Sequence, residues 1–122
     1  LIHAYTISGN KKYLKAAEDC LHYILGSNPL NMCFVTSFGD NSPQHIHDRR
    51  SSADKIDAPI PGLLVGGPTT AARSDCGEDK YKSTFPALSY TDMECSYSTN
   101  EIAINWNAPL AFLVNAINAI NK

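Results

Sequence analysis

The sequence predicts a helical protein in which long loops separate two main helices. Three observations predict this class: an apolar stripe with helical spacing near the start, an apolar run near the end, and many glycines and prolines between them. The 122 residues are 43% hydrophobic and 18% charged, a composition typical of a folded globular domain. The net charge of −2 gives no basis for a nucleic-acid partner, and no apolar run is long enough to span a membrane.

The first main helix is predicted over residues 11–25. Its apolar stripe consists of Leu14, Ala17, Leu21 and Ile24. Ser8 or Asn10 is expected to cap its start, because both side chains can accept a hydrogen bond from the first turn. Gly26 and Pro29 are expected to end it.

Two further helical segments are predicted at the ends of the chain. Residues 1–6 are expected to be the tail of an earlier helix that is broken at Gly9. A long helix is predicted over residues 100–121, and its apolar residues surround much of its circumference, so it should be buried on more than one side. Pro109 removes one backbone donor, which predicts a kink or a second helix start.

The segment between these helices has no helical period. Residues 33–36 and 62–65 are candidates for short strands. Two helices cannot bury so much irregular chain alone, and a compact domain carries long loops mainly where they are functional. We therefore expect this segment to rest on further scaffold and to hold the functional site.

A first candidate cluster contains two histidines and an arginine. In extended chain, His45, His47 and Arg49 point to the same side. They could bind sugar hydroxyls or a carboxylate. A His-x-His pair can also chelate a metal ion, although the adjacent Arg49 cation opposes this, and a structural or surface role is a third alternative.

A second candidate cluster contains three carboxylates (Asp92, Glu94 and Glu101) and two tyrosines, Tyr90 and Tyr97. Paired carboxylates carry out glycoside hydrolysis, and aromatic side chains suit the faces of sugar rings. A simpler alternative is that Ser98 and Glu101 form a capping box at the start of the last helix. The residues alone leave both alternatives open.

The four cysteines are Cys20, Cys33, Cys76 and Cys95. They contain no Cys-x-x-Cys pair, which argues against a zinc knuckle or a thioredoxin-like site. Cys76 and Cys95 lie in one polar loop region and are the favoured disulfide pair. Four reduced thiols are the alternative.

Taken together, the motifs resemble those of glycoside hydrolase family 9. Residues 34–49 resemble the histidine signature of that family, with His47 and Arg49 at its cleft positions, and residues 62–68 resemble the loop that follows. The second signature is matched at every spacing by Tyr90, Asp92, Tyr97, Glu101, Asn107 and Ala108. Asp48 and Ile46 depart from the histidine and proline that are common in the family.

The resemblance implies an all-α fold, the (α/α)6 barrel. Residues 1–122 would form one C-terminal fragment of its catalytic domain, with only the C-terminal helices and long active-site loops. It also implies an inverting hydrolase of the endo-1,4-β-glucanase (cellulase) type, which cleaves β-1,4-glucosidic bonds. Glu101 would be the general acid, and the base would lie on an N-terminal segment outside these residues.

The resemblance also implies roles for the neighbouring side chains. Asp92 and His47 would support catalysis, while Arg49, Tyr97, Trp106 and His45 would bind substrate, with barrel core as the alternative for Trp106. The expected partners are cellulose or a β-1,4-glucan oligosaccharide and the N-terminal part of the same catalytic domain. No cofactor or metal is required for the chemistry, structural calcium is compatible with the full domain, and an extracellular location is expected. An exo-β-glucosaminidase and a non-catalytic carbohydrate-binding fragment are the alternatives.

Overall fold

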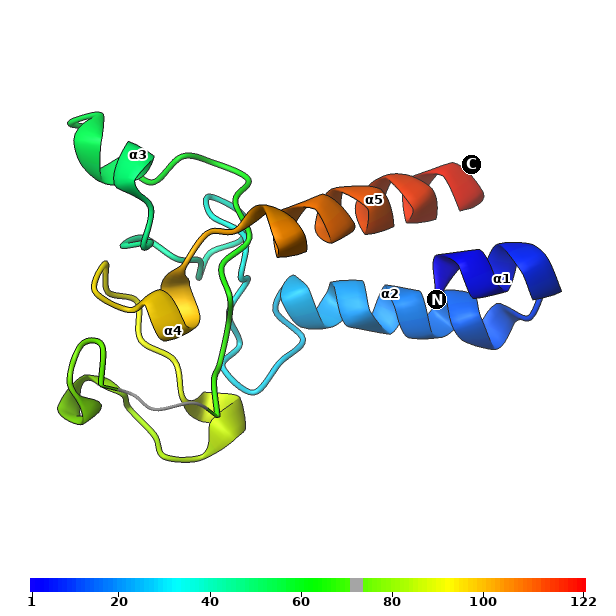
Figure 1. Ribbon diagram of the computed structural model, residues 1–122. Helices are drawn as coiled ribbons and strands as arrows, with labels where there is room; N and C mark the ends of the chain where they lie inside the picture. Colours follow the sequence, from blue (N-terminus) through cyan, green and yellow to red (C-terminus); the bar gives the residue numbers. More distant parts are fainter. Residues whose placement is uncertain (71–73) are drawn as a thin grey trace.

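The computed structural model describes residues 1–70 and 74–122. Its helices are α1 (Ile2–Ser8), α2 (Lys11–Ile24), α3 (Arg49–Ala53), α4 (Tyr97–Asn100) and α5 (Ile104–Ile120), with 3-10 turns at Glu78–Lys80 and Pro86–Leu88. Helices α1, α2 and α5 lie together on one side, and the long loops with α3 and α4 lie on the other (Figure 1). No strand forms in the described part of the chain, which confirms the all-α prediction.

The N-terminal helices begin and end close to where the sequence predicts. The Asn10 side chain accepts a hydrogen bond from the Lys12 amide at 3.0 Å and so caps α2. Helix α1 continues to Ser8 and ends at Gly9, whose φ of 67° is a left-handed conformation that glycine adopts without strain. Ala17 is fully buried in α2, where α1 and α5 pack against that helix.

The last helix begins later than predicted. Residues 101–103 are not helical, because the backbone of Glu101 and Ile102 pairs with that of His47 and Val65 instead. From Ile104 onward, α5 continues through Pro109 as one helix. The long-range pairing therefore overrides the local helical pattern over the first residues of the predicted segment.

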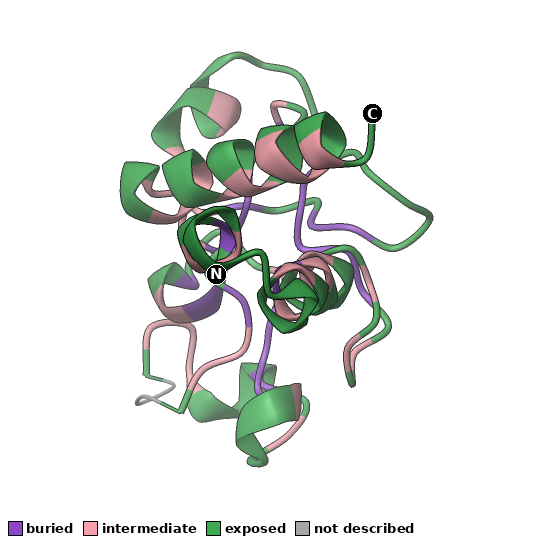
Figure 2. Ribbon diagram, turned by 90° about the vertical axis from the view of Figure 1, so that its right-hand side faces the viewer, coloured by how far each residue is buried: buried purple, intermediate pink, exposed green. Residues whose placement is uncertain are grey.

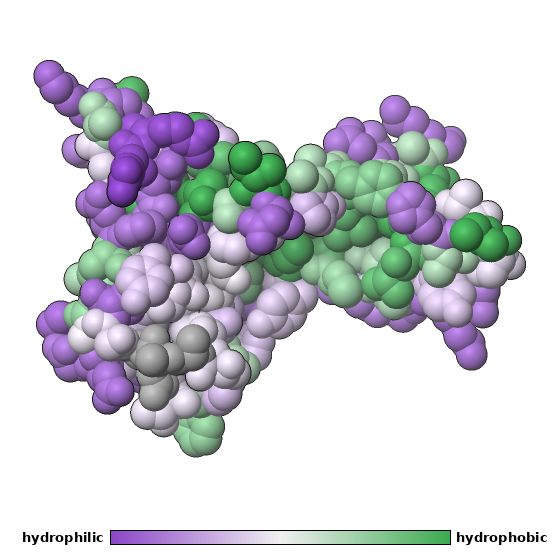
Figure 3. Space-filling model, in the orientation of Figure 1, coloured by the Kyte–Doolittle hydropathy of each residue, from purple (hydrophilic) through white to green (hydrophobic). Residues whose placement is uncertain are grey.

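Helix α5 is apolar but not buried within the described residues. All of its residues are at least partly exposed, and Phe112 and Val114 are 48% and 42% exposed. Apolar side chains gather over α5 and the adjoining α2 (Figure 3). No helix among the described residues is long and apolar enough to cross a lipid bilayer.

The buried core lies in the loops rather than between the helices (Figure 2). Its members are Met32, Cys33, Phe34, Val35, Ile46, Leu64, Val65 and Tyr90, with Trp106 and Leu110 packed against them. The strands predicted at 33–36 and 62–65 do not form. Single antiparallel bridges join Val35 to Leu64 and Val65 to Ile102. These contacts bring the histidine segment and the carboxylate segment to the same end of the helices.

Candidate active site

The two candidate clusters meet through a parallel backbone bridge between His47 and Glu101. The His47 amide donates to the Asn100 carbonyl at 2.9 Å. Glu101 is partly exposed, and its carboxylate makes no hydrogen bond to any other described side chain or backbone group. The bridge therefore places the backbone of Glu101, whose carboxylate has no hydrogen-bond partner among the described residues, next to the backbone of His47.

The capping-box alternative for Glu101 is wrong. Ser96 caps α4, and its hydroxyl accepts from the Thr99 amide at 3.3 Å. Glu101 follows the C-terminal end of this helix in an extended conformation, with φ −68° and ψ 145°. Its carboxylate is therefore available for another role.

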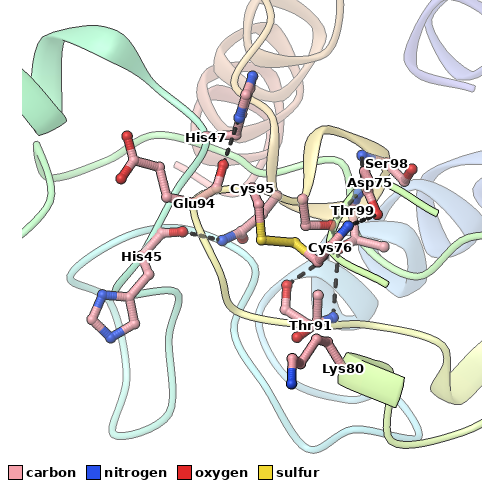
Figure 4. The surroundings of a disulfide bond; sticks show 12 residues. His45, His47, Asp75, Cys76, Lys80, Thr91, Glu94, Cys95, Ser98 and Thr99 are labelled. Atoms are coloured by element: carbon pink, nitrogen blue, oxygen red, sulfur yellow. Dashed lines mark hydrogen bonds between the residues drawn. A yellow bond between two sulfur atoms is a disulfide. The ribbon is translucent and has the colours of Figure 1, made fainter. Parts of the chain in front are cut away.

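One ring nitrogen of His47 is fixed by the carboxylate segment. Nδ1 lies 2.5 Å from the Glu94 carbonyl oxygen (Figure 4). A carbonyl only accepts, so Nδ1 carries the proton of this hydrogen bond, and in the neutral ring Nε2 is left as an acceptor. The ring lies edge-on to Tyr97, which is 57% exposed, with 6.3 Å between the ring centroids. An exposed aromatic face thus adjoins an imidazole acceptor.

The predicted common direction of His45, His47 and Arg49 is wrong. The His45 and His47 imidazoles point away from one another (Figure 4). Arg49 begins α3, so the extended conformation on which the prediction depended ends at Asp48. His45 and Arg49 are both exposed, and His45 lines a polar hollow together with Ser52 and Lys55.

Asp92 joins the histidine segment to α4. Its carboxylate accepts from the amides of Gln44 and His45 at 2.8 and 3.0 Å, and from the Asn100 side chain at 2.9 Å. A carboxylate that accepts three hydrogen bonds fixes the backbone around it. This geometry fits a supporting role rather than proton transfer.

Asn100 is a site residue for which sequence reasoning predicted no role. Its side chain is completely buried, donates to the His45 carbonyl at 2.6 Å and accepts from the Tyr90 hydroxyl at 2.5 Å. Burial, and then the negative charge of Asp92, raise the pKa of Tyr90, so this hydroxyl remains a donor. The sequence signal that could have indicated this role is the position of Asn100 directly before Glu101, within a matched signature.

Trp106 holds the loop of residues 62–68, which follows the histidine segment. Its indole N–H donates to the Leu64 carbonyl at 3.0 Å, and the Asn107 side chain accepts from the Leu64 amide at 2.8 Å. Trp106 also lines an apolar hollow with Phe34 and Tyr97. The ring therefore has a packing role here, and its predicted contact with sugar stays a prediction.

The favoured disulfide is present. Cys76 and Cys95 are bonded, with their Cα atoms 5.3 Å apart (Figure 4). Cys20 and Cys33 are free thiols. The described residues contain no group of three or more histidine, cysteine, aspartate or glutamate side chains placed to hold a metal ion.

The family assignment follows from the match of residues 1–114 to the sequence profile of "Glycosyl hydrolase family 9". The chain belongs to glycosyl hydrolase family 9. It is 43% identical over 120 residues to a xyloglucan-specific endo-beta-1,4-glucanase of Bacteroides ovatus, covering 98% of this chain and 20% of the relative. It is 37% identical over 123 residues to a cellulose 1,4-beta-cellobiosidase of Acetivibrio thermocellus, covering 98% of this chain and 14% of the relative.

Solved structures of family 9 proteins share this fold. A Bacteroides ovatus family 9 structure superposes with a TM-score of 0.84 at 41% identity, covering 99% of this chain and 20% of that one. A solved structure of AaCel9A in complex with cellobiose-like isofagomine gives a TM-score of 0.66 at 40% identity, covering 82% of this chain and 19% of that one. The chain spans about a fifth or less of the length of these relatives. The helical structure is consistent with the predicted (α/α)6 barrel.

Proposed function

We propose that this chain carries the general acid of an inverting β-1,4-glucanase, and that Glu101 is that acid. The observation that carries the proposal is the backbone bridge between His47 and Glu101, whose carboxylate makes no hydrogen bond among the described residues, in a family 9 chain. The names of its relatives, an endo-beta-1,4-glucanase and a cellobiosidase, support a β-1,4-glucan as substrate.

In the proposed reaction, protonated Glu101 donates its proton to the glycosidic oxygen as the bond to the sugar carbon breaks. A carboxylate on the opposite face of the sugar removes a proton from the attacking water, and in inverting enzymes the two carboxyl groups are ~6.5–9.5 Å apart. The second carboxylate is proposed to lie on an N-terminal segment of the catalytic domain. Water then adds to the face opposite the leaving group, so a β-linked substrate releases an α-configured product.

The neighbouring groups would orient the sugar. The Nε2 acceptor of His47 can bind a sugar hydroxyl while Nδ1 stays on the Glu94 carbonyl. The exposed ring of Tyr97 can stack against the C–H face of the same or the next sugar. Such orientation lowers the barrier by reducing the entropy that is lost when the transition state forms. Arg49 and His45, at the margin of this arrangement, are proposed to contact sugars farther along the chain.

The partner and the location are also proposals. The exposed apolar residues of α5 would pack against the N-terminal part of the same catalytic domain, as an apolar helix needs burial. The disulfide between Cys76 and Cys95 supports export, since disulfides persist mainly in oxidising compartments. Calcium is assigned no role in the chemistry.

The configuration of the first product tests this function. The full-length enzyme is incubated with cellotetraose, and proton NMR follows the anomers before they equilibrate. Early accumulation of the α-anomer is expected, whereas early β-anomer would contradict inversion. Parallel assays on xyloglucan and chitosan oligosaccharides separate a glucanase from a glucosaminidase, and binding without hydrolysis would favour a non-catalytic carbohydrate-binding protein.

A further inference from the structure

Helix α4 connects the disulfide to the candidate acid. It spans only Tyr97–Asn100, and Glu101 follows it directly. At its C-terminal end, Asn100 is fixed by Asp92 and the His45 carbonyl. The position of the Glu101 backbone therefore depends on what fixes the other end of this short helix.

The N-terminal end of α4 is held by Asp75, a residue of a separate loop. One carboxylate oxygen of Asp75 accepts from the Ser98 amide at 2.9 Å. The other accepts from the Tyr81 hydroxyl at 2.6 Å and from the Cys76 amide at 2.9 Å. Burial alone would raise the pKa of Asp75, but these hydrogen bonds outweigh it and lower the pKa to about 2. Asp75 is therefore an ionised acceptor at neutral pH.

A second set of contacts joins the same loop to the inside of α4. Tyr81 is only 7% exposed, and its hydroxyl lies 2.9 Å from that of Ser96. The Ser96 hydroxyl lies 2.7 Å from that of Thr99, and both side chains are fully buried. These hydroxyl contacts fix the buried side of α4, while Asp75 binds the backbone at its N-terminal end.

The disulfide makes this attachment covalent. Cys76 follows Asp75, and Cys95 lies one residue before Ser96, the cap of α4 (Figure 4). Cys95 also follows Glu94, whose carbonyl fixes the His47 ring. A displacement of the Asp75 loop would thus shift both Glu101, through α4, and His47, through Glu94.

We propose that Asp75, tethered by the Cys76–Cys95 disulfide, is a positioning residue for Glu101. It does not touch the substrate; it holds α4 so that the Glu101 carboxylate reaches the glycosidic oxygen. The inference rests on the proposed role of Glu101 as acid. A displacement of the catalytic carboxylate by about 1 Å, even when a mutation away from the substrate causes it, can lower turnover by up to ~100-fold.

Asp75→Asn in the full-length enzyme tests the inference, with Asp79→Asn as the matched control. Asp79 lies on the same loop, but its carboxylate is exposed and pairs only with Lys80 among the described residues. For Asp75→Asn we expect kcat on cellotetraose to fall ~10- to 100-fold with little change in KM. The loss should be much smaller on an aryl cellobioside with an acidic phenol, because that leaving group needs little proton transfer. Asp79→Asn should match the wild type on both substrates.

Tyr81→Phe keeps the packing and removes one hydrogen bond to Asp75, so it tests the same inference should Asp75→Asn fail to fold. We expect the same dependence on the leaving group with a smaller loss. Equal losses of kcat on both substrates, or no loss for a folded variant, would overturn the positioning role. If Glu101→Gln itself shows no dependence on the leaving group, the assignment of the acid fails instead.

Discussion

Loss of the Asn100 side chain should destabilise the protein strongly. Asn100→Ala removes two hydrogen bonds to uncharged partners, Tyr90 and the His45 carbonyl, and one to the Asp92 carboxylate. At about 1 kcal/mol for each of the first two and about 2 kcal/mol for the third, we expect the free energy of unfolding to fall by about 4 kcal/mol. The cost is high because Asn100 is fully buried and water cannot replace the lost partners.

Equilibrium unfolding of the full-length enzyme in guanidinium chloride measures this loss. Asn41→Ala is the matched control, because Asn41 is exposed and its side chain donates one hydrogen bond, to the Asn31 carbonyl. The control should lose less than about 1 kcal/mol. Equal losses for the two variants would refute the reasoning that Asn100 holds the site together.

Three further predictions concern the neighbouring groups. The pKa of Asp75 is lowered from 3.8 to about 2, so its stabilisation is complete above pH 3.8 and is lost as pH falls through about 2. In acid unfolding, the free energy of unfolding of the wild type should fall by about 1 kcal/mol between these two pH values, after allowance for the partial exposure of Asp75. Asp75→Asn should not show this fall. Replacing Cys76 and Cys95 by serine opens a link with a sequence separation of 19, which should cost about 3 kcal/mol in a denaturant titration. His47→Ala should lower kcat with a nearly unchanged melting temperature, and His45→Ala should lower kcat less; the reverse order would contradict the assignment.

Local chemistry explains which features the sequence could predict. The cap at Asn10, the break at Gly9 and the apolar stripe of α2 depend on residues within a turn or two of each other. The disulfide between Cys76 and Cys95 followed from their shared loop region. The resemblance to family 9 located the two segments of the candidate site but not their hydrogen bonds.

Contacts between distant segments explain what could not be predicted. Pairing of Glu101 with His47 ends the helical conformation where the local pattern continues it. The role of Asn100 depends on carbonyl and carboxylate groups contributed by other loops, and Asp75 gains its role only when its loop folds against α4. A periodic pattern of residues within one segment of the sequence cannot predict these contacts between distant segments.

The central claim is that Glu101 donates the proton, and one set of kinetics tests it most directly. Glu101→Gln removes the proton donor but preserves the size of the side chain. In the full-length enzyme, kcat/KM on cellotetraose should fall by at least ~100-fold, because the leaving alkoxide needs a proton, while the loss on an aryl cellobioside with an acidic phenol should be much smaller. Glu78→Gln, on an exposed turn, is the control and should match the wild type on both substrates. Equal losses on the two substrates, or none on either, would contradict the claim.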